Sequence, residues 1–390
     1  MSLMLPNKPF LLFLFSFSIL LNCKEATQNL TPDDFYIEEG DNTKNNYAEG
    51  FLVTKNNNHS ILEIKNPWPE SNQTFKYVLI SKEEAAKTTF NNDAYDGIII
   101  TPVQKIVVTS TTHIPALELL GVEQTLVGFP GTDYVSSNKT RARIDNKNIR
   151  ELGKNEGLNT EVLLELNPDV VVAFGVDGKS KSLETIKKAS IPVIYNGDWI
   201  EKSALAKAEW IKFFGALYNK EKEADSIFNT IKQDYNEAKI LAQNANAKPT
   251  ILCGAMYKDI WYLPNGTSTE AQLLKDGNTN YLWSHTKDKG SIPLNFEIVF
   301  NKAQNADFWL SPSYYTSKDA LLKGSSHYSK FNAFKNDNIY TFANTTGETG
   351  GVLYYELGTA RPDLVLKDIV KICHPELLPD YNTFFFKKLK

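Results

Sequence analysis

Aromatic and polar side chains follow nearly every predicted strand of this chain, and their types suit the binding of a ligand. Loops at the carboxyl ends of parallel strands form the ligand crevice of an open α/β sheet. The rings of the aromatic side chains offer a large apolar surface for stacking, which suits a porphyrin, a corrin or a catecholate chelate. The candidates are Thr112, His113, Phe129, Tyr134 and Trp199 in the first half of the chain and Tyr257, Trp261, Tyr262 and Tyr314 in the second. Trp210 and Trp309 are predicted to be core residues instead.

Two arginines could add positive charge to such a site. Arg141 and Arg143 lie in a predicted polar loop that begins at Ser136. A guanidinium binds an anionic iron chelate or a propionate through paired hydrogen bonds, so Arg141 is a candidate ligand-binding residue. The alternative is a solvated arginine of an ordinary loop.

The histidines do not form a predicted metal cluster. The five histidines are scattered, with no His-x₃-His pair and no His-rich tract, so binding of bare zinc or manganese is not expected. His113 could ligate haem iron together with a tyrosine from the other half of the chain. A lone histidine after a strand is more often structural, and this alternative stays open.

Motifs of covalent chemistry are missing from the sequence. It contains no Gly-x-Ser-x-Gly, no Walker A loop and no His-Glu-x-x-His. The net charge of −4 gives no general attraction to nucleic acid. We therefore expect a binding protein that has no enzymatic activity and no cofactor of its own.

Cys23 stands at the end of a predicted export signal. Lys8 precedes an apolar run over residues 10–21, which is typical of a secretory signal and too short to span a bilayer. The sequence Leu20-Leu21-Asn22-Cys23 resembles a bacterial lipobox, in which the cysteine thiol is diacylated; a plain signal peptide that contains a cysteine is the alternative. We expect a signal peptide over residues 1–22, lipidation of Cys23, and a flexible polar tether over residues 23–46. The protein would then lie in the periplasm, anchored to the inner or the outer membrane.

Strands alternate with helices through most of the chain, which indicates an α/β fold with parallel sheets. Residues 47–97 show short alternating runs separated by turn signals and are predicted to form a small β-rich extension. Residues 98–202 contain four predicted short apolar strands separated by helices, and residues 247–390 show the same alternation of strands and helices. The sequence therefore predicts two Rossmann-like lobes.

Residues 203–246 separate the two lobes and are predicted to be helical. Residues 203–243 contain no proline and a single glycine, Gly215, and their apolar side chains recur at helical spacing. We expect one long helix, or two consecutive helices with Gly215 near the join, that acts as a rigid strut.

The two predicted lobes also share a sequence pattern. A helix that begins near Glu161 leads to Asp169 and a buried strand, and a helix that begins near Glu297 leads in the same way to Asp307 and another strand. A glutamate is favoured at a helix N-terminus by the macrodipole. Two similar lobes joined by a strut should leave a cleft between them.

Three stretches of the chain carry a resemblance to a known family. They read KIVVTS at 105–110 with LELLGV at 117–122, NTEVLLELNPDVV at 159–171, and RPDLVLKD at 361–368 with HPEL at 374–377. In these stretches the chain resembles the class III periplasmic substrate-binding proteins of ABC importers, which carry iron-siderophores, haem and vitamin B12. The resemblance covers about residues 104–379, and the β extension with its Asn-rich tether looks like the Bacteroidetes-type members.

The resemblance implies a monomer with two lobes, a rigid helical connector, and one ligand held between the lobes with little closure. Fold alone does not fix the ligand, so siderophore, haem and cobalamin remain open. The implied partner is an ABC permease of the inner membrane. The family docks on its permease through one glutamate of each lobe, and the matching residues are Glu161 and Glu270. For each of them, an ordinary first-turn glutamate is the alternative.

Two other classes of function are weighed against this one. An adhesive or structural surface lipoprotein would bind a partner through the β extension and leave the cleft empty. A bilobal enzyme, such as a chelatase, would need cofactor-ligating cysteines beyond Cys253 and Cys373. We expect these two cysteines to be separate buried thiols, although an oxidising compartment would allow them to pair.

Overall fold

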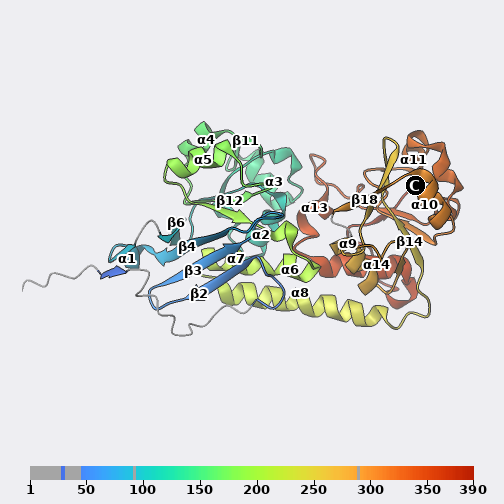
Figure 1. Cartoon of the computed structure of the whole chain (residues 1–390), viewed down its shortest axis with the longest axis horizontal. Helices are drawn as coiled ribbons and strands as arrows, with labels where there is room; N and C mark the ends of the chain where they lie inside the picture. The colour runs from blue at the N-terminus through green and yellow to red at the C-terminus, as the bar shows by residue number, and fades with distance from the viewer. Residues whose placement is uncertain (1–27, 31–44, 91–93, 288–289) are drawn as a thin grey trace, which may run out of the picture.

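Two α/β lobes lie side by side, and helix α8 (Glu221–Ala242) runs along one edge of both (Figure 1). The computed structural model describes residues 28–30, 45–90, 94–287 and 290–390. The predicted signal peptide, Cys23 and most of the predicted tether lie outside the described residues. Among the helices of these ranges, none has both the length and the apolar character needed to cross a membrane.

The N-terminal lobe is built on a five-stranded parallel sheet with the strand order β13-β12-β7-β8-β9. The central strand β7, its neighbour β12 and the edge strand β13 are almost entirely buried. This burial explains why they appear in the sequence as continuous apolar runs. The strands are β7 (Ile106–Val108), β8 (Leu126–Phe129), β9 (Arg150–Glu151), β12 (Val170–Phe174) and β13 (Val193–Asn196). The connecting elements are α2 (Ile114–Leu119), α3 (Asn138–Asp145), the hairpin β10 (Gly153–Lys154) and β11 (Gly157–Leu158), α4 (Thr160–Leu166) and α5 (Lys181–Lys188).

The C-terminal lobe repeats this plan with the strand order β17-β14-β19-β20-β21, parallel except for the last pair. A second sheet of three antiparallel strands, β15, β16 and β18, is inserted after β14. The strands are β14 (Thr250–Cys253), β15 (Ala255–Tyr257), β16 (Ile260–Pro264), β17 (Asn280–Tyr281), β18 (Ser291–Leu294), β19 (Phe308–Leu310), β20 (Ile339–Thr341) and β21 (Lys387–Lys388). The helices are α9 (Thr269–Asp276), α10 (Phe296–Ala303), α11 (Lys318–Gly324), α12 (Asn332–Lys335), α13 (Leu353–Leu357) and α14 (Pro362–Cys373).

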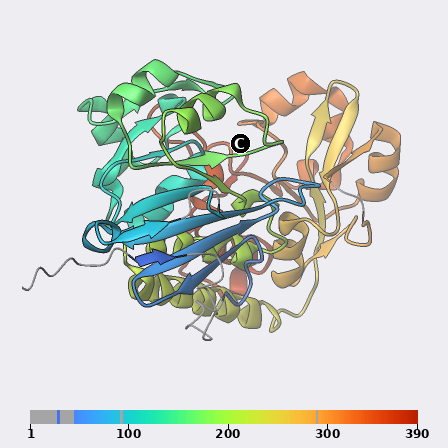
Figure 2. The same cartoon turned by 60° about the vertical axis from the view of Figure 1, so that its left-hand side comes forward.

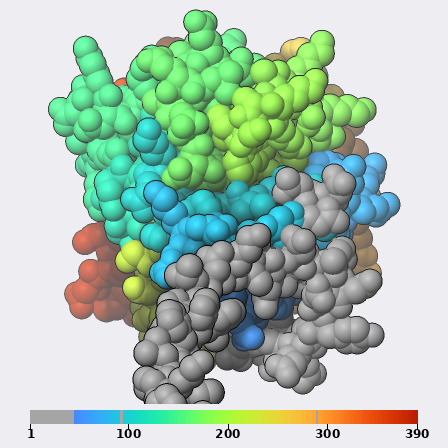
Figure 3. Space-filling view, turned by 90° about the vertical axis from the view of Figure 1, so that its left-hand side faces the viewer, coloured from blue at the N-terminus to red at the C-terminus, as the bar shows by residue number. Residues whose placement is uncertain are grey.

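The predicted β extension is a four-stranded sheet with the order β2-β3-β4-β6. Strands β2 (Phe51–Lys55), β3 (His59–Lys65) and β4 (Thr74–Ser81) are antiparallel, and β6 (Gly97–Thr101) runs parallel to β4. Helix α1 (Lys82–Ala85) follows β4, and β5 (Thr88–Phe90) pairs with β1 (Gln28–Leu30). This blue sheet lies between the green N-terminal lobe and the olive helix α8 (Figure 2), and from this end the extension and the lobe form one continuous surface (Figure 3).

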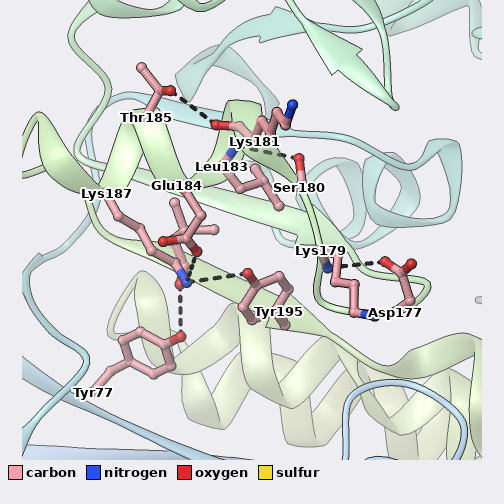
Figure 4. Close-up of polar contacts among 11 residues, drawn as sticks. Tyr77, Asp177, Lys179, Ser180, Lys181, Leu183, Glu184, Thr185, Lys187 and Tyr195 are labelled. Carbon is pink, nitrogen blue, oxygen red and sulfur yellow. Dashed lines mark hydrogen bonds and ion pairs between the residues drawn. The ribbon is translucent and has the colours of Figure 1, made fainter.

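The extension is tied to the N-terminal lobe by a buried polar contact. The hydroxyl of Tyr77 in β4 donates to the carbonyl oxygen of Val193 in β13 at 2.7 Å (Figure 4). Beside it, the ammonium of Lys187 lies 3.2 Å from the hydroxyl of Tyr195 and 3.2 Å from the carboxylate of Glu184 (Figure 4). Because both partners of the Tyr77 bond are buried, the extension is an integral part of this lobe and not an appended module.

The predicted strut is three helices, not one or two. Helix α6 (Ala204–Glu209) and α7 (Ile211–Leu217) precede α8, and only α8 is long. The first break falls at Trp210, whose ring is buried against Phe51 of the extension at 4.8 Å. The second falls at Asn219, which has a left-handed φ of 55° that ends a helix. Gly215 lies inside α7, where a Cβ would come within 2.6 Å of Ala224 of α8, so glycine permits close packing there.

Candidate ligand-binding cleft

A cleft of about 660 Å³ lies between the segment that follows β13 and the carboxyl-end loops of the C-terminal sheet. Its N-terminal wall is the stretch from Trp199 to Lys202 together with Lys207, and its C-terminal wall includes the loops after β14, β19 and β20. The aromatic residues that line it are Trp199, Tyr257, Tyr262, Phe342, Tyr354, Tyr355 and Phe386. Their position agrees with the rule that ligands bind at the carboxyl ends of parallel strands.

Trp199 is held by the turn that ends β13. The backbone N–H of Asp198 donates to the side-chain oxygen of Asn196 at 2.8 Å, which closes a tight turn before the short 3₁₀ helix Asp198–Ile200. The indole of Trp199 then packs on Phe174 at the end of β12, with 5.5 Å between ring centroids. Trp199 therefore lies at the cleft as predicted.

The alternation of strand β16 separates two neighbouring aromatic residues. Successive side chains of a strand point to opposite faces, so Tyr262 faces the cleft and Trp261 faces the core. Trp261 is fully buried, donates from Nε1 to the carbonyl oxygen of Cys253 at 2.9 Å, and stacks on Trp309 at 5.4 Å. The prediction of Trp261 as a ligand-binding residue is wrong, whereas the assignment of Trp210 and Trp309 to the core is confirmed.

Three predicted residues near α2 and β8 do not reach the cleft. Phe129 belongs to the buried face of the N-terminal sheet. His113 is fully buried with its ring 5.8 Å from Phe214, and burial lowers the pKa of His113 to about 3, so the imidazole is neutral and enclosed. Thr112, its neighbour in the same turn, instead donates its hydroxyl to Asp198 at 2.9 Å and lines a small cavity beside the cleft.

Tyr134 and Tyr314 lie outside the cleft lining. Both are about 70% exposed, at 72% and 67%. The ring of Tyr314 lies 6.0 Å from that of Tyr355, which does line the cleft, so Tyr314 marks its rim. Tyr134 lies on the N-terminal lobe where the loop around Gly351 approaches it.

Neither arginine supplies charge to the cleft, because the predicted polar loop is helix α3. The guanidinium of Arg141 is buried, donates to the carbonyl oxygen of Thr132 at 2.8 Å and pairs with Asp145 at 3.2 Å. Arg143 donates to backbone carbonyls that include that of Leu126, at 3.0 Å. Both side chains are therefore used to hold local loops, and the prediction of Arg141 as a ligand residue is wrong.

The two predicted docking glutamates lie in different environments. Glu161 is exposed in the first turn of α4, where Asn159 caps the helix by accepting from the N–H of Val162 at 3.2 Å. Glu270 also stands in a capped first turn, that of α9, but it lines the cleft. The resemblance assigns Glu270 to an outer docking surface, whereas the structure places it among the residues that line the cleft.

Four aromatic residues of the lining were not predicted from the sequence. Phe342, Tyr354, Tyr355 and Phe386 all come from the segment that follows β20. The rule that identified the other candidates applies here too, because Phe342 directly follows the carboxyl end of β20. Cys253 lies at the floor of the cleft, and both it and Cys373 are free, buried thiols, as expected.

A buried carboxylate joins the two lobes next to this cleft. Glu356 of α13 accepts from the backbone N–H groups of Ser136 at 2.6 Å and Ser137 at 2.9 Å, both in the N-terminal lobe. The pKa of Glu356 is raised to about 7, because burial and the charge of Glu118 raise it by more than the two N–H donors lower it. We call this contact the Glu356 clasp. Glu356 directly follows Tyr354 and Tyr355 in the sequence, so one short helix, α13, contributes both to the clasp and to the wall of the cleft.

The Glu356 clasp predicts a pH-dependent stability. An acid whose pKa rises from 4.5 to about 7 on folding binds its proton more tightly in the native state, so the free energy of unfolding falls as pH rises from about 4.5 to 7. The contribution is on the order of 3 kcal/mol. Urea unfolding of Glu356→Gln across this range should show a flatter pH profile than wild type, whereas Glu348→Gln, an exposed change nearby, should keep it. Identical profiles for wild type and Glu356→Gln would contradict the assignment.

Comparisons with known proteins agree with this architecture. The sequence model of the family described as periplasmic binding protein matches residues 106–345. An uncharacterized lipoprotein of Methanocaldococcus jannaschii is 27% identical over 326 residues, which span 80% of this chain and 76% of that protein. The β2-β3-β4-β6 extension precedes the residues that the family model matches.

Two solved structures share the fold at low sequence identity. A possible iron-binding (periplasmic solute-binding) protein from Staphylococcus epidermidis has a TM-score of 0.56 and 19% identity, over 70% of this chain and 100% of that chain. The periplasmic heme-binding protein RhuT from Roseiflexus has a TM-score of 0.53 and 18% identity, over 70% of this chain and 99% of that chain.

Proposed function

We propose, since this chain belongs to the periplasmic binding protein family, that it is the substrate-binding component of an ABC importer. It captures a metal chelate, of the siderophore, haem or cobalamin kind, in the cleft between its lobes and delivers it to an inner-membrane permease. The observation that carries the proposal is the cleft of about 660 Å³ with aromatic walls between two lobes of the same α/β plan. The work is selective binding and handover, and no covalent step is needed.

The size and lining of the cleft support a flat or bulky organic cargo. Ligand sites in proteins commonly enclose about 300–1,000 Å³ and combine apolar rings with a few placed polar groups. Here Trp199 lines the N-terminal wall and Tyr257, Tyr262 and Tyr355 line the C-terminal wall, so the lining contains both apolar rings and phenol groups. Two structures of the same fold carry descriptions as iron-binding and heme-binding proteins, which favours the same class of cargo.

We assign the permease contact to Glu161 and Glu297 in place of Glu161 and Glu270. Helix α4 leads into β12 and helix α10 leads into β19, and each of these strands is the parallel neighbour of the first strand of its lobe's α/β unit. Each glutamate is exposed at the second position of its helix, behind a capping asparagine. The two residues are therefore topological equivalents, which Glu161 and Glu270 are not.

The chain is attached to a membrane through Cys23 in this proposal. Two relatives from Methanocaldococcus jannaschii are named lipoproteins, and the chain spans 76% and 80% of their lengths. Cys23 itself lies outside the described residues, so the anchor rests on the lipobox and on these relatives.

Titration of intrinsic tryptophan fluorescence tests the cargo. Addition of haemin, cyanocobalamin and a set of ferric siderophores should give a saturable change with one of them, reported by Trp199. Trp199→Ala should weaken that binding by about 1 kcal/mol or more, roughly five- to tenfold, because one stacking face is lost. Tyr134→Ala, an exposed change outside the cleft, serves as the matched control and should bind like wild type. If no chelate binds, the proposed function is wrong.

Exchange of the docking charges tests the partner. Glu161→Lys combined with Glu297→Lys should abolish uptake and leave cargo affinity in solution unchanged, because reversed charge opposes a basic permease surface. Asp319→Lys, at the second position of the capped helix α11, should leave uptake intact. Normal transport by the double variant would remove both glutamates from the docking surface.

Phase partitioning tests the anchor. Cys23→Ser should yield a protein that folds and binds cargo but enters the aqueous phase of a detergent extraction, since acylation supplies its membrane affinity. Wild-type protein should enter the detergent phase. A variant that still follows wild type into detergent would exclude Cys23 as the lipid attachment site.

A further inference from the structure

Four charged side chains line the described part of the cleft, namely Glu201, Lys202, Lys207 and Glu270. Two of them are engaged by the start of the β extension. The carboxylate of Glu201 accepts from the backbone N–H of Gly50 at 2.9 Å, with Glu49 contributing a second N–H at 3.1 Å. The ammonium of Lys202 pairs with the carboxylate of Glu49 at 2.7 Å.

The third charge, that of Lys207, faces a buried carboxylate beside the cleft. Asp198 is almost fully buried, and one of its oxygens accepts from Thr112 while the other has no hydrogen-bond partner among the described residues. Burial raises the pKa of Asp198, and the bond from Thr112 and the charge of Lys207 oppose that rise. Lys207 and Asp198 line the same small cavity, so the charge of Lys207 is partly offset within the N-terminal wall.

Glu270 is the remaining charge, and it has no such compensation. Its helix α9 is capped by Ser268, whose hydroxyl oxygen accepts from the N–H of Ala271 at 3.1 Å, so the carboxylate is not needed as the cap. Within the described ranges, it forms no ion pair and no hydrogen bond. The dipole of a helix favours a negative charge at this position.

The rings around Glu270 are neutral hydroxyl donors. Burial raises the pKa of Tyr354 and Tyr355 far above neutrality, and the charge of Glu270 raises both further. Lys258 lies over the ring of Tyr257 at 5.5 Å but is not among the residues that line the cleft. The described lining therefore combines tyrosine hydroxyls with one uncompensated negative charge.

We propose that Glu270 selects the cargo by charge: the cleft takes a chelate that is cationic, or neutral with exposed N–H donors, and discriminates against strongly anionic chelates. This inference rests on the proposed function and narrows it. A positive or N–H-bearing group of the cargo would supply the partner that Glu270 lacks, whereas an anionic cargo would face like charge in a partly enclosed site. Neutral corrins with amide side chains and cationic ferric hydroxamates fit this description, and haem propionates and ferric tricatecholates do not.

Calorimetric titration of the full-length protein with four probes tests the proposal. The probes are ferrioxamine B, whose free ammonium makes the complex cationic, neutral cyanocobalamin, haemin, and an anionic ferric tricatecholate. The tightest binder should be one of the first two, at least tenfold tighter than either anionic probe. Glu270→Gln should weaken that binder at least tenfold, and Glu270→Lys should weaken it further while improving an anionic probe. Asp319→Asn, at the matching position of the Ser-capped helix α11, should change neither.

The outcomes distinguish a failure of charge selection by Glu270 from a failure of the proposed function. If an anionic probe binds wild type most tightly, or if Glu270→Gln leaves the affinity of the best probe unchanged, charge selection by Glu270 is wrong while the proposed function stands. If none of the four probes binds, both are wrong. A melting temperature of each variant within about two degrees of wild type would establish that lost binding is not lost folding.

Discussion

The position of the two lobes depends on a buried carboxylate that spans them. Glu356 offers its two oxygens to two successive N–H groups of the opposite lobe, at 2.6 and 2.9 Å. The loop before it also approaches closely, since a Cβ on Gly351 would stand 2.2 Å from the carbonyl oxygen of Tyr134. Together with α8, which runs along both lobes, the Glu356 clasp connects them at a second place. The two lobes are therefore in contact at two separate places.

The sequence predicted the positions of strands and helices better than the points at which one helix ends and the next begins. Apolar runs such as 170–173 and 308–310 became strands at nearly the predicted bounds, because a parallel sheet covered on both faces favours apolar side chains. The helical period over 203–243 was also correct, yet it does not show where a helix stops. The breaks depend on Trp210, buried against the extension, and on the left-handed backbone of Asn219, and neither is visible in a hydrophobic pattern.

The site was predicted in outline and missed in detail for a related reason. The carboxyl-end rule brought Trp199, Tyr257 and Tyr262 to the cleft, but it cannot tell which face of a short strand its aromatic residues take. Trp261 and Tyr262 are adjacent, and the alternation of the strand places one in the core and the other at the cleft. In the same way, Glu161, Glu270 and Glu297 all begin capped helices, and only the tertiary arrangement separates a cleft residue from two outward-facing ones.

The β extension affects the charges that line the cleft, although its residues are far from the lining residues in sequence. Glu49 forms an ion pair with Lys202, and the N–H groups of Glu49 and Gly50 donate to the carboxylate of Glu201, so both lining side chains have partners in the extension. The residues matched by the family model begin only at 106, and the extension therefore modifies a cleft whose aromatic walls belong to the matched fold or follow it. With Lys202 paired to Glu49, Glu270 is the lining carboxylate that has no partner among the described residues. The segment before β2 thus changes the charge balance of the cleft without contributing a side chain to its lining.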